Sequence, residues 1–156
     1  MRKLGHESNE ILHSKRREKG EIIADLLSRA KNAHDNGYYI ESLGVLAIIL
    51  EERIFSVNSK LIPTYPNNKS LDKKTLGSLI NDFLELYKLN PSLKIYFSQN
   101  LVNYLNWNLQ IRNNIFHHLI DDDLIQDNND LSDLSDDALV YVREFINSAQ
   151  RWKKHK

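Results

Sequence analysis

The 156-residue chain contains no cysteine, which excludes disulfide bonds, thiolate metal sites and cysteine nucleophiles. It has only five glycines and three prolines. No stretch approaches the roughly 18 consecutive apolar residues of a membrane span. The N-terminus begins with basic and polar residues and lacks the apolar core of a secretory signal. These absences lead us to expect a soluble, cytoplasmic protein that does not contact a membrane.

Net charge is also absent, because 21 lysines and arginines balance 21 aspartates and glutamates. A neutral chain argues against a surface built mainly to hold nucleic-acid phosphates. The charges are unevenly distributed, however: basic residues cluster at 15–19 and 151–156, whereas 121–137 is strongly acidic. Blocks of this kind are usually solvated faces or loops.

Apolar residues recur at helical spacing over most of the chain, and no strand pattern is evident. The expected elements are a helix at about 8–36, a helix at about 38–57, a loop at 58–69, a helix that Ser70 caps and Asn90-Pro91 ends, a short helix at 92–103, a helix at about 104–120, an acidic loop at about 121–135, and a last helix. We therefore predict an all-α, up-and-down bundle of four to five main helices in a single domain covering 1–156.

The apolar faces of these helices indicate how they pack. The stretch 43–50 is apolar nearly all round, so the second helix is expected at the centre of the bundle or under a partner. Side chains expected on the buried face of the last helix are Ala138, Val142, Phe145, Ala149 and Trp152. Aromatic residues expected in the core or in an interface are Tyr38, Tyr39, Trp107 and Trp152.

One segment, Arg112-Asn113-Asn114-Ile115-Phe116-His117, lies inside a helix that is otherwise amphipathic. On a helical wheel that advances about 100° per residue, Arg112 falls near the middle of an apolar arc. Leu105, Leu109, Ile115, Phe116 and Leu119 form that arc. A permanently charged guanidinium there needs a reason, because an unpaired buried charge is expensive. Asn113 and His117 lie one turn apart on the flank of the arc, and this grouping is the candidate site.

The arginine-to-histidine spacing is not unique in the chain. Arg29 and His34 have a matching separation, but an alanine follows that arginine. His118 also lies at an allowed distance from Arg112, although on the wheel it points away from Asn113. The wheel therefore favours His117 over His118.

Several carboxylates are candidates to assist the site. Glu51 and Glu52, at the end of the second helix, would balance Arg112 unless they simply face solvent. Asp121, four residues beyond His117, either orients the imidazole or belongs to the acidic loop. A structural interpretation also stays open, in which Arg112 is buried against a carboxylate and His117 is merely exposed.

Other chemistries find no support in the sequence. The six histidines show no paired metal-ligand spacing. Serine nucleophile elbows and glycine-rich phosphate loops are absent as well. We therefore expect no metal and no cofactor.

The sequence from Arg112-Asn113 to His117 resembles the motif of the HEPN family. HEPN domains are small all-α bundles whose helix near the C-terminus carries an arginine, a polar residue and, a few positions later, a histidine. The segments 105–109 and 76–80 are also similar to members of that family. As in the family, the motif falls on the penultimate long helix expected from the sequence.

The resemblance implies a metal-independent endoribonuclease that acts as a toxin or in antiviral defence. It implies a homodimer in which two motifs face each other across the twofold axis. Arg112 would bind and orient the scissile phosphate, His117 would act as general acid or base, and Asn113 would hold the site in register. The implied partners are an RNA substrate and an antitoxin or a nucleotidyltransferase.

Two competing functions are compatible with the same residues. The first is a non-catalytic HEPN-like helical module for binding or dimerisation, for example with a nucleotidyltransferase. The second is an unrelated helical regulator whose basic terminal segments bind nucleic acid by electrostatics alone, with a steep dependence on salt.

Overall fold

The computed structural model describes residues 4–65, 74–118 and 128–155, and it describes side chains for 18–65, 74–109 and 130–155. In these ranges the only regular secondary structure is helix. The helices are α1 (Leu4–Asp35), α2 (Tyr39–Leu61), α3 (Leu76–Leu89), α4 (Pro91–Tyr96), α5 (Gln99–His118) and α6 (Asn128–Lys154). The prediction of an all-α helical bundle is confirmed. None of the helices, over the residues described, combines the length and apolar character needed to span a bilayer.

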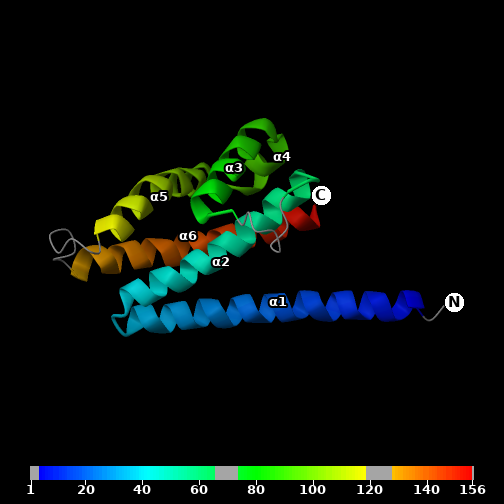
Figure 1. Cartoon of the computed structure of the whole chain (residues 1–156), viewed down its shortest axis with the longest axis horizontal. Coiled ribbons are helices and arrows are strands. Elements are labelled where there is room, and N and C mark those ends of the chain that lie inside the picture. Colours follow the sequence, from blue (N-terminus) through cyan, green and yellow to red (C-terminus); the bar gives the residue numbers. More distant parts are fainter. Residues whose placement is uncertain (1–3, 66–73, 119–127, 156) are drawn as a thin grey trace.

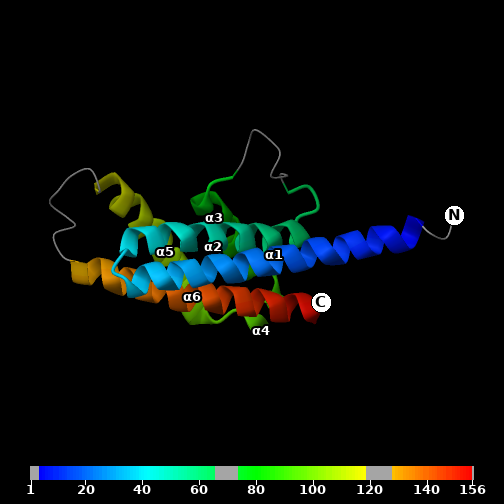
Figure 2. The same ribbon diagram turned by 90° about the horizontal axis from the view of Figure 1, so that it is seen from below.

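Helix α2 is the centre of the bundle. It packs against α1, α6 and α3, and Figure 2 shows α1, α2 and α6 running side by side. Figure 1 shows α3, α4 and α5 on the side of α2 and α6 opposite to α1. In the same view α5 runs towards the end of the bundle where α6 begins, whereas α2 and α6 terminate together at the other end. The apolar second helix was predicted either at the centre of the bundle or under a partner, and it lies at the centre.

The core is organised around three phenylalanines from different elements. Phe83 of α3, Phe97 directly after α4 and Phe145 of α6 are each at most 1% exposed. Their ring centroids lie 5.2–5.4 Å apart, and pairs in this geometry contribute about 0.5–1.5 kcal/mol beyond area burial. Trp152 closes the C-terminal end of this core at 1% exposure, and the predicted buried face of α6 is confirmed.

The connection between α1 and α2 follows the predicted stop. Gly37 adopts a φ of +81°, the left-handed conformation that a glycine tolerates best. The amide of Tyr38 donates to the carbonyl of Ala33 and closes the turn. The hydroxyl of Ser42, which is fully buried, donates to the carbonyl of Ala30 at 2.8 Å and fixes the two helices against each other.

Helix α2 is longer than its sequence indicated. It continues to Leu61, so the expected loop at 58–69 was wrong at its start. Asn58 is fully buried, and its amide donates to the carbonyl of Leu79 at 3.0 Å and to the hydroxyl of Tyr65 at 3.1 Å. Tyr65 in turn donates to Asp82 at 2.7 Å, and burial together with this contact raises the pKa of Tyr65 to about 12. A residue that favours turns is thus held in a helix by tertiary hydrogen bonds.

The start of α3 also differs from its prediction. Ser70, the expected cap, lies outside the described residues, and the N-cap of α3 is Thr75, whose side chain accepts a hydrogen bond from the amide of Ser78. Asn90 and Pro91 occupy the predicted cap and first helical positions of α4. The segment expected as one short helix at 92–103 is divided at 97–98, and α5 begins at Gln99 rather than near 104.

Helix α6 begins inside the segment expected to be an acidic loop. It starts at Asn128, so the part of that loop from 128 to 135 is helical, while 121–127 lies outside the described residues. Leu131 is 7% exposed and Ser135 is fully buried. The aspartates therefore lie on the outer side of an amphipathic helix, and their number obscured its buried face in the sequence.

Candidate functional site

Helix α5 contains the residues that the sequence singled out. Arg112, Asn113 and His117 all lie within its last two turns, and the backbone is helical through His118. The helical separation of one turn between Asn113 and His117 is therefore present. The side chains of Arg112, Asn113, His117 and His118 lie outside the described part of the chain. Asp121 lies outside it altogether.

The described half of α5 is held firmly by the core. Leu101 and Leu105 are fully buried, and Leu109 packs against the core cluster. Helix α3 approaches closely at Gly77, where a methyl group would lie 3.4 Å from Cδ2 of Leu109. Because Leu109 precedes Arg112 by less than one turn, this packing fixes the direction of the last two turns of α5, which contain the candidate site.

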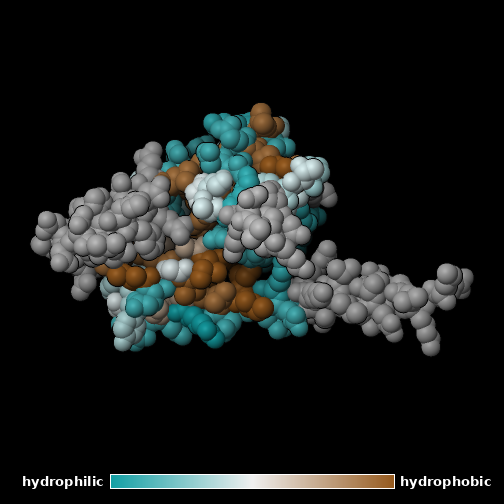
Figure 3. All heavy atoms as spheres, viewed as in Figure 1, coloured by the Kyte–Doolittle hydropathy of each residue, from teal (hydrophilic) through white to brown (hydrophobic). Residues whose placement is uncertain are grey.

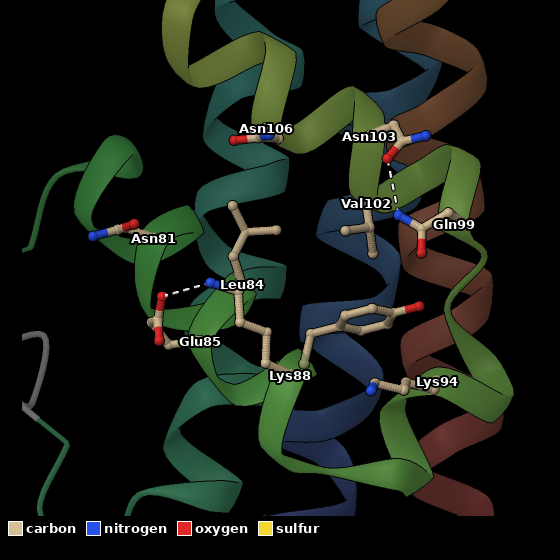
Figure 4. A pocket seen from close by; sticks show the side chains of 10 residues that line it. Asn81, Leu84, Glu85, Lys88, Lys94, Gln99, Val102, Asn103 and Asn106 are labelled. Atoms are coloured by element: carbon tan, nitrogen blue, oxygen red, sulfur yellow. Dashed lines mark hydrogen bonds and ion pairs between the residues drawn. The ribbon is translucent and has the colours of Figure 1, made fainter.

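A polar pocket of about 500 Å³ opens between α3, α4 and the first half of α5. Carboxamide side chains dominate its lining, from Asn81 on α3 and from Gln99, Asn103 and Asn106 on α5 (Figure 4). The amide of Gln99 donates to Asn103 at 2.9 Å. Such groups both donate and accept hydrogen bonds, so the pocket suits a ligand with mixed polar edges.

Two lysines also line this pocket. Lys88 pairs with Glu85 at 3.2 Å, and the ammonium of Lys94 lies 6.0 Å from the ring centroid of Tyr87. Both lysines are exposed, so positive charge borders the carboxamide lining (Figure 4).

The carboxamides of α5 continue in sequence towards the candidate site, a regularity that was not predicted from the sequence. Positions 99, 103, 106, 110, 113 and 117 carry Gln, Asn, Asn, Gln, Asn and His, with separations that alternate between four and three residues. This spacing follows one face of a helix. The signal was available in the sequence, but only a helix that begins at 99 makes it continuous.

A second, smaller hollow of about 320 Å³ lies between α5 and α6. Tyr104 and Tyr141 stack there with centroids 4.3 Å apart, beside Trp107 and Asp137. Burial, followed by the nearby carboxylate of Asp137, raises the pKa of Tyr104 well above its usual range. Tyr104 is thus a protonated phenol with no tendency to act as a base at neutral pH. Trp107 is 40% exposed, so it does not belong to the core.

The second sequence match, Arg29 with His34, has a structural role. Arg29 pairs with Asp25 on the surface of α1 at 3.2 Å. His34 Nδ1 lies 2.9 Å from Oγ of Ser135, and its Nε2 lies 3.3 Å from Oδ1 of Asp136. The trio has the composition of a hydrolase triad, but Ser135 is fully buried and no substrate reaches it.

The acidic residues considered as partners for Arg112 include one whose contacts the structure describes. Glu52 pairs with Lys19 at 3.4 Å and with Arg53 at 3.6 Å, and is half-buried. Glu52 therefore has cation partners on α1 and α2, and its pairing with Arg112 stays a prediction because the side chain of Arg112 lies outside the described residues. Among the residues that the structure describes, no three or more metal-binding side chains lie close enough together to hold an ion.

No protein-family model, no curated protein and no solved structure matches this chain. Membership of the HEPN family therefore stays a prediction that depends on the motif at Arg112, Asn113 and His117.

Proposed function

We propose that this chain is a metal-independent endoribonuclease of the HEPN type, acting as a toxin or antiviral-defence effector with a composite active site at a homodimer interface. The single observation that carries the proposal is the sequence Arg112-Asn113 with His117 one turn later, within the penultimate helix of an all-α bundle. The fold and the helical spacing support the resemblance, and the chemistry follows from the residue types.

The reaction would use the substrate's own 2′-hydroxyl as the nucleophile. An imidazole acting as base takes the hydroxyl proton while a bond forms between the 2′-oxygen and phosphorus. The bond between phosphorus and the 5′-oxygen breaks, and that oxygen receives a proton from the acid. Arg112 would hold the two non-bridging oxygens and stabilise the developing charge with its donor fork. The products are a 2′,3′-cyclic phosphate and a free 5′-hydroxyl.

A homodimer would supply the second imidazole that the reaction needs. A single His117 provides one imidazole, whereas two copies of α5 across a twofold axis provide one base and one acid. Asn113, one turn before His117, would hydrogen-bond the imidazole or the phosphate and keep the two helices in register.

The carboxamide-lined pocket supports single-stranded RNA as the substrate. Unpaired bases present donor and acceptor edges that Asn and Gln side chains recognise. The pocket lies on α5, and the carboxamide spacing leads from Gln99 towards Asn113. A strand bound along α5 would therefore place bases in the pocket while its phosphates approach the candidate site.

The outer face of α2 supports the dimer. Ile48 is 60% exposed and Ile40 is 45% exposed, and they lie two turns apart on the apolar helix α2. Figure 3 shows hydrophobic side chains gathered over the same part of the molecule. Exposed apolar patches of this kind mark contact surfaces more often than chance.

Cleavage of a mixed RNA substrate in EDTA tests the proposal. Wild-type protein should produce fragments that end in a 2′,3′-cyclic phosphate, and His117→Ala and Arg112→Ala should each lower the rate by about 10²-fold or more. His118→Ala should leave the rate unchanged.

Two exposed residues outside the motif provide matched controls. Arg29→Ala removes an arginine that pairs only at the surface with Asp25, and His155→Ala removes an exposed histidine. Both variants should cleave at the wild-type rate. Wild-type cleavage in the His117→Ala variant would refute the assignment of the site.

The exposed isoleucines of α2 also favour a second function, a non-catalytic HEPN-like module that binds a partner such as a nucleotidyltransferase. In that case the wild-type protein would leave RNA intact, and Ile48→Glu would abolish association with the partner. Cleavage that requires His117 would exclude this alternative.

A further inference from the structure

Four cations gather where the middle of α1 passes the end of the bundle at which α2 and α6 terminate. This cation cluster consists of Lys19 from α1, Arg53 and Lys60 from α2, and Lys153 from α6. Polar contacts connect its members to α2: Lys153 donates to the hydroxyl of Ser56, and Lys19 and Arg53 both pair with Glu52. The candidate ribonuclease residues lie on α5, which runs towards the opposite end (Figure 1).

Arg53 is the most enclosed member of the cation cluster. Its side chain is only 15% exposed, and its Nε is buried with no hydrogen-bond partner among the residues that the structure describes. The contact from its Nη2 to Glu52 measures 3.6 Å, which is long for a hydrogen bond. The guanidinium thus has donor capacity that the described chain does not use.

The charges in the cluster are unfavourable for one another. Burial and then the positive charges of Arg53 and Lys60 lower the pKa of Lys153 to about 8, although Glu52 opposes the change. Burial also lowers the pKa of Arg53. The desolvation of Arg53 and Lys153, together with the repulsion that Lys153 meets from its cationic neighbours, opposes folding.

An anion between the helices would reverse this balance. A phosphate oxygen accepts hydrogen bonds from a guanidinium fork, from ammonium groups and from a hydroxyl, and the cluster offers all three donor types in Arg53, Lys153 and Ser56. Glu52, already engaged by Lys19 and Arg53, would keep some of the positive charge compensated when the anion leaves.

We propose that the cation cluster of Lys19, Arg53, Lys60 and Lys153 binds a phosphate group. The group is either a free phosphate or a phosphate in the backbone of RNA, and both present the same oxygens. The proposal does not depend on ribonuclease activity, because the cluster and the α5 motif lie on different helices.

Thermal unfolding in sodium phosphate, compared with sodium chloride of equal ionic strength, tests for the free anion. At saturating phosphate the melting temperature of the wild type should rise by about 2–4 °C. Arg53→Gln and Lys153→Met should lose this rise. Lys153→Met removes a repelled cation, so it folds even if Arg53→Gln does not. Lys154→Gln, which removes an exposed neighbouring lysine, is the control and should keep it.

Anisotropy of a labelled, fully 2′-O-methylated single-stranded RNA tests for the backbone phosphate. This probe has no free 2′-hydroxyl, so its binding is independent of any cleavage. Arg53→Gln and Lys153→Met should weaken binding several-fold and reduce the slope of affinity against salt by about one, unlike Lys154→Gln.

The two measurements together decide the proposal and its source. A melting shift that both cluster variants lose identifies a free phosphate, and an RNA effect alone identifies a backbone phosphate. If phosphate stabilises all variants equally and RNA affinity is unchanged in the cluster variants, the cluster is not a phosphate site.

Discussion

His34 Nδ1 lies 2.9 Å from the hydroxyl of Ser135 across 101 residues of sequence. The contact joins the last turn of α1 to the first turns of α6, and the second nitrogen of the same ring lies 3.3 Å from Asp136. One imidazole thus connects the two helices at the end of the bundle that α5 approaches. It acts as a structural link rather than as a reactive group, since Ser135 is fully buried.

Ser135→Ala should therefore lower stability and leave activity intact. Losing one hydrogen bond to a partly buried ring should reduce the free energy of unfolding by about 1 kcal/mol, measured by urea denaturation. Ser132→Ala, nearly one turn earlier on α6, should change it by less than about 0.5 kcal/mol. Loss of RNA cleavage in folded Ser135→Ala would show that the trio is catalytic after all.

The lowered pKa of Lys153 predicts a specific dependence of stability on pH. Between its folded value of about 8 and its ordinary value of 10.5, the unfolded chain binds more protons than the folded one. The free energy of unfolding that Lys153 contributes should therefore rise with pH across this window.

Comparison with a variant isolates this contribution. The difference in unfolding free energy between wild type and Lys153→Met should increase from pH 8 to 10.5 and then level off, because other titrating groups cancel. The same difference for Lys154→Met should stay flat. A flat curve for Lys153→Met would mean that neither burial nor the neighbouring cations lower the pKa of this lysine.

The exposed face of α2 gives a prediction about assembly. If the chain is the proposed dimeric ribonuclease, Ile48→Glu should convert the dimer into a monomer in light scattering and lower RNA cleavage at least tenfold, because each site then has one imidazole. Val140→Glu alters a side chain on α6 with the same exposure of 60% and should leave the dimer intact. If Ile48→Glu stays dimeric, the interface lies on another surface.

Two glycines should respond in opposite ways to alanine. Gly37→Ala forces a side chain into a positive φ and should lower the free energy of unfolding by about 1 kcal/mol. Gly44 lies inside α2, where a methyl group would meet nothing within 4 Å. Gly44→Ala should raise stability by about 0.5–1 kcal/mol. Destabilisation by Gly44→Ala in urea unfolding would indicate that this helix face is constrained by more than the described contacts.

The fold was predictable from the sequence where local patterns, such as apolar periodicity and helix-stop residues, determine the structure. The all-α class, the turn at Gly37, the start of α4 at Pro91 and the buried face of α6 all follow from local patterns. Boundaries were wrong where tertiary contacts outweighed local preference. Asn58 favours a turn, yet its hydrogen bonds to Leu79 and Tyr65 retain it in α2.

The candidate site was predictable only in part. The motif at Arg112, Asn113 and His117 is visible in the sequence, since all three residues belong to one helix. The contribution of Asn81 to the pocket and the pairing of Lys19 with Glu52 depend on how helices pack, which spacing along one helix does not encode. Trp107 was expected in the core or an interface, and it is excluded from the core of the chain.

The two tryptophans give the molecule a pair of independent optical reporters. Trp152 is sealed in the core at 1% exposure, whereas Trp107 is 40% exposed on α5, five residues before Arg112. With Trp107→Phe, intrinsic fluorescence would follow core unfolding alone. With Trp152→Phe, the remaining indole would register events on the surface of α5, so the proposed binding of RNA and the proposed dimerisation could be followed without an attached dye.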